Sequence, residues 1–379
     1  MTQTADTKYK NKIEALLSKA DIHVNGDRAW DMQVHNPGLF GRIIGQGSLG
    51  LGESYMEGWW DCDQLDDFFY KLLDANLKTH VTTLRDKLFY VRAHLLNRQK
   101  GKRAFEVGSK HYDAGNDLYE RMLDKRMIYT CGYWQDADNL DLAQEHKLEL
   151  VCRKLKLQPG MRVLDIGCGW GGAARYMAEH YDVEVVGVSV SQEQVNMANH
   201  KAKEQGLNAE FRFQDYRDVN EEFDRVYSLG MFEHVGFKNY AEYFEVANRC
   251  LKDGGLFLLH SIGHRVTSEI VDPWIERYIF PNSILPSSEL ISRHSAHLFT
   301  IEDWHNFGLD YVKTLHAWRG NANAAWSDLP AYDEEFQRMW NYYLMCCAAA
   351  FRLYRNHLWQ VVFSKGIQTE PYTAVRSAI

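Results

Sequence analysis

Short apolar runs alternate with amphipathic stretches between about residue 144 and residue 263. The apolar runs RVLDIG, VEVVGVSV, AEFRFQD, DRVYSLG and GGLFLLHSIG predict strands at 162–167, 183–190, 209–215, 224–230 and 254–263. In the intervening stretches, apolar residues recur at spacings of three and four, which predicts helices at 148–157, 172–181, 191–207 and 239–251. Near-continuous apolar strands alternating with helices are typical of an α/β fold with a buried, mainly parallel sheet and helices on both faces.

The pattern continues on both flanks of this region. Apolar residues at helical spacing in YKNKIEALLSKA and DDFFYKLLDANLK indicate that residues 8–97 are largely helical. Toward the carboxyl end, DYVKTLHAW (310–318) and HLWQVVFSKG (357–366) predict two late strands on either side of a long helix over 334–356. We therefore expect a smaller, mostly helical amino-terminal domain and a larger α/β domain.

A basic segment lies between these two regions. The sequence RQKGKR at 98–103 has four cations in six residues. It is either a solvated linker or a basic patch that contacts an anionic membrane surface. In both cases the domain boundary falls here, with domains at 1–97 and 105–379 and a linker at 98–104.

Composition narrows the class of protein. The chain has 379 residues, of which 45% are hydrophobic, enough for the cores of two domains. The net charge of −8 gives no global electrostatic case for nucleic-acid binding. The cysteines include no CxxC pair, the amino terminus lacks a signal-peptide core, and the most apolar stretch (342–351) is too short to span a bilayer. We therefore expect a soluble cytoplasmic protein with reduced thiols.

Aromatic residues, at 13%, either line a cavity for an apolar or cationic ligand or simply pack the core.

A glycine-rich loop follows the first predicted strand. In LDIGCGWGG the glycines Gly167, Gly169 and Gly172 match GxGxxG, a spacing that lets the backbone approach a ligand at a helix amino terminus. Asp165 stands just before the first glycine. Its carboxylate would repel a pyrophosphate but would orient an ammonium group, which S-adenosylmethionine has and NAD lacks.

The next two strand ends bear on the same choice. An NAD site needs an acidic residue near the end of the second strand, where this chain has Ser189 and Gln194. The third strand ends in Asp215 and Tyr216, a carboxylate and a ring that could hold adenine. The pattern favours S-adenosylmethionine, with a dinucleotide-dependent oxidoreductase as the alternative.

Several motifs together resemble one enzyme family. LDIGCGWGG, GVSVSQEQ, GMFEHVG, KHYDAGND, YTCGYW, LLHSIG and EDWHNFGLDY are similar to motifs of the S-adenosylmethionine-dependent cyclopropane synthases, over essentially the whole chain. The resemblance implies a class I methyltransferase (Rossmann-like) catalytic domain. The segment GSLGLGESYMEGWWDCDQLDDFF resembles the amino-terminal domain of the bacterial members that act on phospholipids. That domain is expected to bind the membrane or help deliver the acyl chain.

The resemblance also implies the chemistry and its residues. The family transfers a methyl carbon to the cis double bond of an unsaturated phospholipid acyl chain and closes a cyclopropane ring, with bound bicarbonate as the base. The matching bicarbonate pocket is Cys131, Glu233, His260, Ile262 and Tyr311. The residues around the methyl donor are Tyr129, Thr130, Gly167, Gly169, Ser189, Gln194 and Tyr216. A homodimer that works at the inner face of the cytoplasmic membrane is implied as well.

Each of these residues also has a structural interpretation. Glu233, directly after a strand, could be a solvated strand end, and its neighbour His234 is expected to have a structural role. Cys131 could be a nucleophile, but no general-base motif accompanies it. His260 could bind zinc, but it has no HxxH or CxxC partner, so no metal is expected.

Other interpretations of the whole chain stay open. The segment VDPWIERYIFPNSILPS (271–287) is either an apolar lid over an acyl tunnel or an ordinary packed insertion. Three other functions fit parts of the pattern: methylation of a small-molecule amine, methylation of the alkene without ring closure, and lipid binding without catalysis.

Overall fold

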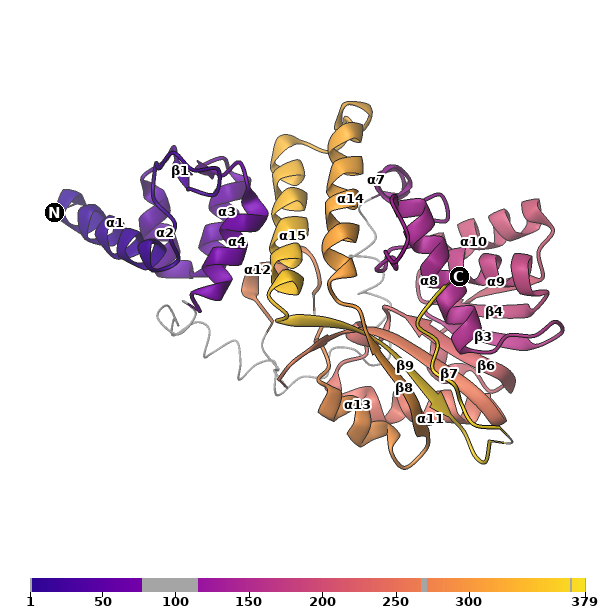
Figure 1. Cartoon of the computed structure of the whole chain (residues 1–379). Helices are drawn as coiled ribbons and strands as arrows, with labels where there is room; N and C mark the ends of the chain where they lie inside the picture. The colour runs from indigo at the N-terminus through magenta and orange to yellow at the C-terminus, as the bar shows by residue number, and fades with distance from the viewer. Residues whose placement is uncertain (1, 77–114, 267–270, 282, 369, 379) are drawn as a thin grey trace. The chain divides into compact units, whose positions relative to one another are not determined.

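The computed structural model describes residues 2–76, 115–266, 271–281, 283–368 and 370–378 (Figure 1). The expected linker at 98–104 lies outside the described residues. The described chain divides into two compact units. The first contains 2–76, 271–281 and 315–355, and the second contains 115–266, 283–314 and 356–378. The sequence predicts one uninterrupted domain over 105–379. The structure differs from this prediction, because residues 271–281 and 315–355 belong to the unit that contains the amino-terminal helices.

The first unit is mostly helical, as expected. Its elements are α1 (Thr2–Lys19), β1 (Gln33–Val34), α2 (Gly38–Gln46), α3 (Ser48–Met56), β2 (Trp60–Asp61), α4 (Leu65–Asp74), α12 (Pro273–Tyr278), the larger part of α14 (Asp310–Ala325) and α15 (Glu334–Arg352). The strands β1 and β2 form a small antiparallel pair.

Aromatic side chains form the core of this unit. Trp60 and Phe68 are fully buried, with ring centroids 4.9 Å apart. Phe69 on α4 meets Tyr342 on α15 at 4.7 Å, and Trp274 on α12 meets the same tyrosine at 4.3 Å. The amphipathic helix α4 therefore buries its apolar face against segments more than 200 residues further along the chain.

A glycine of the amino-terminal segment allows this packing. A Cβ atom at Gly52 on α3 would lie 2.3 Å from Cδ1 of Trp274. A side chain at this position would occupy the space of the indole ring. The part of segment 271–287 that contains Trp274 is thus a packed insertion, and its proposed lid function is not tested by this contact.

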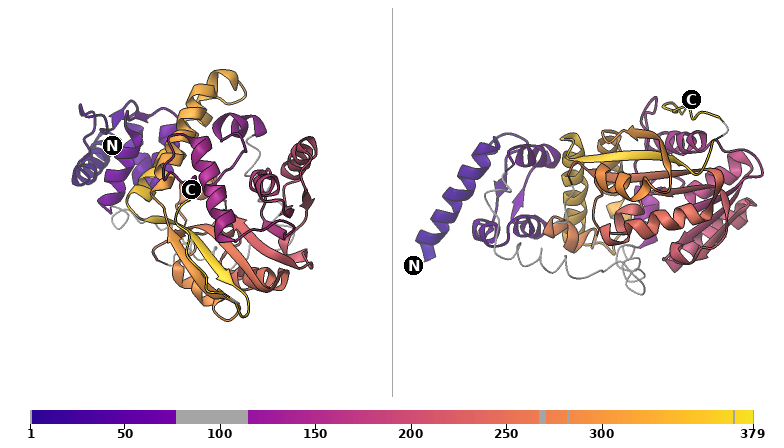
Figure 2. Two further views of the ribbon diagram at one scale, coloured as in Figure 1. Left: turned by 45° about the vertical axis from the view of Figure 1, so that its right-hand side comes forward. Right: turned by 90° about the horizontal axis from the view of Figure 1, so that it is seen from below.

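The second unit is built around a seven-stranded sheet with the order β5-β4-β3-β6-β7-β9-β8. Its strands are β3 (Arg162–Ile166), β4 (Glu184–Ser189), β5 (Ala209–Phe213), β6 (Phe223–Leu229), β7 (Leu251–His264), β8 (Thr300–Asn306) and β9 (Asn356–Ser364). The strands β3 to β7 run parallel to one another, and β9 is antiparallel to its two neighbours, β7 and β8. Figure 2 shows β9, in yellow, between these two strands.

Helices cover both faces of the sheet, as predicted. They are α8 (Leu140–Lys154), α9 (Gly172–Tyr181), α10 (Gln192–Gln205), α11 (Tyr240–Cys250) and α13 (Ser288–Ser295), and a short helix, α7 (Asn116–Met122), precedes them in the chain. Val163 and Val185 face the core with α8, α9 and α10, whereas Leu164 and Val186 face the core with α11 and α13. Successive strand residues thus alternate between two apolar layers, which is why the strands read as continuous apolar runs.

Of the two late strands that the sequence predicts, one is a strand in the structure and the other is part of a helix. The strand predicted at 357–366 is confirmed as β9. The strand predicted at 310–318 is wrong, because these residues begin α14. Tyr311, Leu315, Trp318 and Ala322 are all buried, and their spacing of three and four is that of a helix face.

The sequence also missed β8. Its residues TIEDWHN are mostly polar or partly exposed, and its hydrogen bonds to β9 place it at the edge of the sheet. Within the described part of the chain, no helix is long and apolar enough to cross a membrane.

Candidate active site

The glycine loop after β3 is closely enclosed by its neighbours. Gly167 has φ 90°, and a Cβ atom there would lie 2.6 Å from Cβ of Met231. A Cβ atom at Gly172, where α9 begins, would lie 2.3 Å from the carbonyl oxygen of Arg126. The loop therefore requires glycine at both positions, at the first for its backbone conformation as well as for space.

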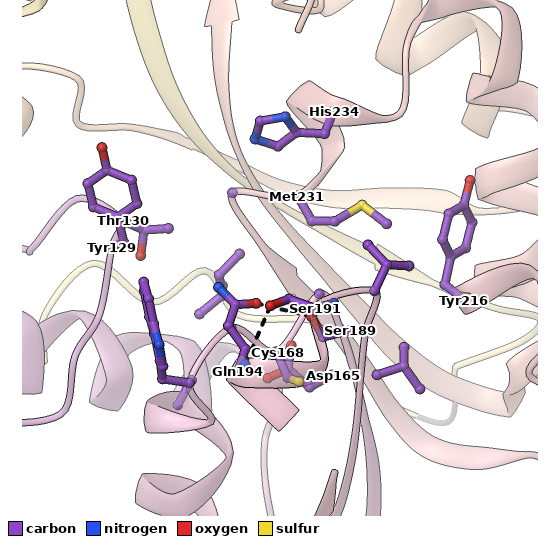
Figure 3. Close-up of a pocket in the computed structure, with 18 of the residues that line it drawn as sticks. Tyr129, Thr130, Asp165, Cys168, Ser189, Ser191, Gln194, Tyr216, Met231 and His234 are labelled. Carbon is purple, nitrogen blue, oxygen red and sulfur yellow. Dashed lines mark hydrogen bonds between the residues drawn. The ribbon is translucent and has the colours of Figure 1, made fainter. Parts of the chain in front are cut away.

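A cavity of ≈ 200 Å³ opens at the carboxyl ends of β3, β4, β5 and β6 (Figure 3). This is the edge of a parallel sheet where ligands gather, at the point where the strand order changes direction. All nine residues predicted to bind the methyl donor line it: Tyr129, Thr130, Asp165, Gly167, Gly169, Ser189, Gln194, Asp215 and Tyr216. The structure thus brings together residues spread over nearly 90 positions of the sequence.

Asp165 is buried beneath the loop. Its Oδ2 accepts a hydrogen bond of 2.7 Å from the Tyr227 hydroxyl. Burial raises the pKa of Asp165 to about 7, and the Tyr227 bond and the charge of Lys147 oppose this rise. An ammonium group in the cavity would favour the ionised carboxylate, because opposite charges attract strongly away from water.

A polar cluster lies where β4 meets α10. The Ser189 hydroxyl donates to Oε1 of the Gln194 side chain at 3.1 Å. The Ser191 hydroxyl caps α10 by accepting from the backbone N–H of Gln194 at 3.4 Å. Gln194 is buried, and among the described residues its Nε2 has no hydrogen-bond partner. A buried amide group of this kind is suited to donate to a polar ligand.

Thr130 is held by a buried lysine that sequence reasoning missed. Lys147 on α8 donates to Oγ1 of Thr130 at 2.9 Å, and Gln144 donates to the Thr130 carbonyl at 2.7 Å. Burial lowers the pKa of Lys147 to about 8. Because the hydroxyl oxygen accepts from the lysine, its own proton is available to the cavity.

Asp215 is paired with a second residue that the sequence did not identify. Arg217 donates from its backbone amide and its Nε to Oδ1 of Asp215, and from Nη2 to Oδ2 at 2.5 Å. The negative charge of Asp215 is thus balanced by the guanidinium group of Arg217. The ring centroid of Tyr216 lies 5.6 Å from that of Tyr243.

Other lining residues could have been recognised from their motifs. Trp170 lies inside the glycine loop, and Met231 and His234 lie inside GMFEHVG. His234 was expected to be structural, yet it lines the cavity (Figure 3). Loss of hydration lowers its pKa to about 4, so this imidazole is neutral at physiological pH.

Glu233 is not a solvated strand end. It lies in a single turn of 3-10 helix, Phe232–His234, and is only 6% exposed. The backbone amide of Ile262 donates to its Oε1 at 2.7 Å, whereas Oε2 has no hydrogen-bond partner in the described part of the chain. Burial raises the pKa of Glu233 to about 7, and the Ile262 hydrogen bond partly opposes this rise.

His260 lies on the same strand as Ile262, two residues earlier. It is 1% exposed, and burial lowers its pKa well below the ordinary value. Its Nδ1 lies 3.3 Å from Nε2 of Gln360, and among the described residues its Nε2 has no hydrogen-bond partner. Glu233 is thus bound to β7 at Ile262, two residues after His260 on the same strand.

Cys131 is fully buried and contacts the first turns of α14, the helix on which Tyr311 is also buried. The Cys131 sulfur lies 3.7 Å from Oγ1 of Thr314, which is three residues after Tyr311. Burial raises the pKa of the Cys131 thiol well above its usual range, which favours the neutral thiol over the nucleophilic thiolate. The ring of His260 lies 5.9 Å from that of Phe307, which precedes α14 in the chain.

Within the segments that the structure describes, no group of three or more histidine, cysteine and acidic side chains could hold a metal ion. His260 lies near amide, ring and lysine groups.

Comparison with known proteins places this chain in a family. A family model described as mycolic acid cyclopropane synthetase matches residues 99–361. The cyclopropane-fatty-acyl-phospholipid synthase of Escherichia coli strain K12 is 55% identical over 365 residues, covering 96% of this chain and 95% of that protein. Cyclopropane mycolic acid synthase 2 of Mycobacterium leprae is 33% identical over 285 residues, covering 67% of this chain and 92% of that protein.

Solved structures agree with these matches. The cyclopropane synthase MmaA2 from Mycobacterium tuberculosis has a TM-score of 0.66 and 30% identity, covering 71% of this chain and 100% of that one. CmaA1, solved with SAH and CTAB, has a TM-score of 0.64 and 32% identity, covering 69% of this chain and 98% of that one. These findings confirm the resemblance drawn from the motifs and the fold of a class I, S-adenosylmethionine-dependent methyltransferase. The chain belongs to the mycolic acid cyclopropane synthetase family.

Proposed function

We propose that this enzyme transfers the methyl carbon of S-adenosylmethionine to the cis double bond of an unsaturated phospholipid acyl chain and closes a cyclopropane ring. The observation that carries this proposal is the 55% identity with a cyclopropane-fatty-acyl-phospholipid synthase over 96% of the chain. The new ring contains the two alkene carbons and the transferred carbon, which loses one proton. The site therefore has to bind the donor, accept that proton and exclude water.

The cavity suits S-adenosylmethionine. Asp165 provides a buried carboxylate for an ammonium group, and Gln194 provides an amide that lacks a partner within the protein. Tyr129, Trp170 and Tyr216 place three aromatic rings around the same cavity. Aromatic faces attract cations, so these rings are suited to a sulfonium group.

The residues at the end of β7 suit bicarbonate, which supplies the base when bound. The Oε2 atom of Glu233 and the Nε2 atom of His260 are buried polar atoms that lack partners in the described chain. We propose that Glu233 accepts a hydrogen bond from the hydroxyl group of this anion and that His260 donates to one of its oxygens. Buried polar groups without partners are rare in folded proteins, and a bound polar ligand would satisfy both.

The remaining pocket residues take more limited roles. The amide of Ile262 already donates to Glu233, so Ile262 positions that carboxylate. We propose that Tyr311 donates from its hydroxyl to the anion and that Cys131 contributes a small, inert side chain and its backbone. The depressed pKa of His260 keeps its ring neutral, which avoids a permanent positive charge beside the positive charge that develops on the lipid.

We also propose where the enzyme works. Its substrate is part of a bilayer, so the enzyme acts as a peripheral protein at the inner face of the cytoplasmic membrane, with its amino-terminal helices taking part in lipid contact. A homodimer, as the family resemblance implies, is proposed as the working form.

The direct test uses purified protein, vesicles of monounsaturated phospholipid and methyl-labelled S-adenosylmethionine. One CH2 group should be added per double bond, with high-field cyclopropane proton resonances and loss of the alkene signal. A methyl-branched product that keeps its alkene would contradict ring closure. Label transferred to added amines but not to lipid would instead support the amine-methylating alternative. Activity should fall in buffer freed of carbon dioxide and return when bicarbonate is added.

A further inference from the structure

A chain of buried polar side chains leads from α8 to His260. His260 on β7 and Gln360 on β9 are directly opposite each other in the antiparallel pair, which places the Gln360 Nε2 atom 3.3 Å from Nδ1 of His260. The Oε1 atom of Gln360 accepts a hydrogen bond of 2.9 Å from Nζ of Lys154. Gln360 and Lys154 are both 0% exposed. The contacts are therefore shielded from water.

The position of Lys154 fixes the direction of the Gln360 amide. The other neighbours of Nζ are Nδ1 of His305 at 3.0 Å and Oδ2 of Asp303 at 3.7 Å. The oxygens of Gln360 and Asp303 can only accept, and Nδ1 of His305 accepts when that ring carries its proton on Nε2, so the protons of the lysine point toward these atoms. If the Gln360 amide were reversed, its NH2 group would face the amine donor and its oxygen would lose a strong partner.

Lys154 is itself held in place. Asp303 is bound by both terminal nitrogens of Arg376, and the carbonyl oxygen of Lys154 accepts from the Tyr372 hydroxyl at 3.1 Å. Burial lowers the pKa of Lys154 to about 7. Whether the nitrogen carries two or three protons, it has donors enough for its two nearest acceptors.

The amide direction determines the tautomer of His260. The Gln360 NH2 group can only donate, so Nδ1 of His260 must accept with its lone pair. A neutral imidazole carries one proton, and here that proton has to be on Nε2. This nitrogen is the one without a partner in the described chain.

We propose that Gln360, oriented by Lys154, is a positioning residue that fixes His260 as the Nε2–H tautomer and so presents a single hydrogen-bond donor to the anion site. The proposal deepens the proposed function, because the donor would face the bicarbonate oxygen there. The opposite tautomer would direct a lone pair at the same oxygen and repel it.

The tautomer can be measured without any ligand. In the full-length protein labelled with 15N-histidine, the two ring nitrogens of a neutral imidazole differ strongly in chemical shift, and the signal of His260 is the one missing from His260→Gln. The wild-type protein should show a protonated Nε2 and an unprotonated Nδ1. A protonated Nδ1 in wild type would overturn the proposal by itself.

Two substitutions test the cause. Gln360→Glu keeps the size of the side chain and can pair with Lys154, but its carboxylate only accepts, so the proton of His260 should move to Nδ1. Ser364→Ala is the matched control, because Ser364 lies on the same strand and face but bonds to Glu302 at 2.5 Å. The control should keep the wild-type tautomer. An unchanged tautomer in Gln360→Glu would contradict the role of Gln360.

Turnover then separates this inference from the function on which it rests. Gln360→Glu should bind S-adenosylmethionine with an affinity near that of wild type while kcat falls on the order of 10²-fold, the effect expected for loss of one preorganised donor. Ser364→Ala should stay within about threefold of wild type. A changed tautomer with unchanged kcat would contradict the role of His260 in the proposed reaction, while the positioning by Gln360 would stand.

Discussion

The backbone amide of Ile262 donates to Oε1 of Glu233 at 2.7 Å, which fixes the carboxylate at the end of β7 and leaves its second oxygen unpaired in the described chain. A strand end thus orients a buried acid without the use of a cationic partner. Since no cation among the described residues pairs with the carboxylate, burial is the main influence on its protonation and raises its pKa to about 7.

This arrangement predicts the effect of Glu233→Gln on catalysis. The amide can still accept from Ile262, so the protein should fold and bind S-adenosylmethionine almost normally. Its NH2 group would misorient the anion, and turnover should fall about 10²–10³-fold. The control is Glu245→Gln, an exposed position on α11, where turnover should stay near the wild-type value. If Glu233→Gln keeps turnover within a few-fold of wild type, Glu233 does not position the base.

The same substitution predicts a pH dependence of stability. Wild-type Glu233 binds its proton more tightly when folded, with a pKa of about 7 against an ordinary value of 4.5. At a pH between these two pKa values, Glu233 is ionised in the unfolded chain and still protonated in the folded protein. The free energy of unfolding therefore falls as the pH rises through this range, by on the order of 3 kcal/mol in total. Glu233→Gln removes this contribution. Its stability relative to wild type, measured by urea unfolding, should rise between pH 4.5 and pH 7.5. A difference independent of pH would contradict the raised pKa.

Asp165 should recognise the amino-acid end of the methyl donor. Asp165→Asn removes the charge, and affinity for S-adenosylmethionine should fall by roughly 1.5–3 kcal/mol. 5′-Methylthioadenosine has no ammonium group, so it provides the matched ligand control. Its affinity should be the same for both proteins in calorimetric titrations. Equal losses for both ligands would indicate general damage to the cavity and would remove Asp165 from ammonium recognition.

Two glycines of the first unit should respond in opposite ways to the same added methyl group. Gly52→Ala places a Cβ atom 2.3 Å from the ring of buried Trp274, so the free energy of unfolding should fall by about 1–3 kcal/mol. At Gly45 a Cβ atom would have no neighbour within 4 Å, and Gly45→Ala should stabilise the helix by about 0.5 kcal/mol. Thermal unfolding of both variants tests this contrast. Similar melting temperatures would contradict the close packing of α3 on α12.

The central part of the fold could be predicted because its signal is local. Each strand from β3 to β7 is an apolar run, and GxGxxG marks the turn after β3. The edge strand β8 could not be recognised, because its pairing with β9 depends on backbone hydrogen bonds that leave no apolar pattern. The short apolar run at 310–318 fits both the two-residue period of a strand and the 3.6-residue period of a helix. In the structure its buried positions follow the helical period.

The candidate site was predictable where a motif marks it. Strand ends and the glycine loop point to Asp165, Ser189, Asp215 and their neighbours. Tyr129, Thr130 and the role of Glu233 follow only from the resemblance to the family. Lys147, Lys154 and Gln360 carry no such mark. Lys147 contacts Thr130, 17 positions away, and Gln360 contacts Lys154 and His260, which are 206 and 100 positions away. Only the three-dimensional structure brings these side chains together.

The division of the chain between its two units has a consequence for biosynthesis. The aromatic residues of α4 pack against Tyr342, so their core is incomplete until α15 has been made. At about 5–20 residues per second, the ribosome needs roughly 10–50 s to add the intervening chain. During that interval Phe68 and Phe69 have no native partner from α15, and the nascent amino-terminal helices present apolar surface to chaperones. The part of the protein synthesised first is therefore among the last to acquire its complete core.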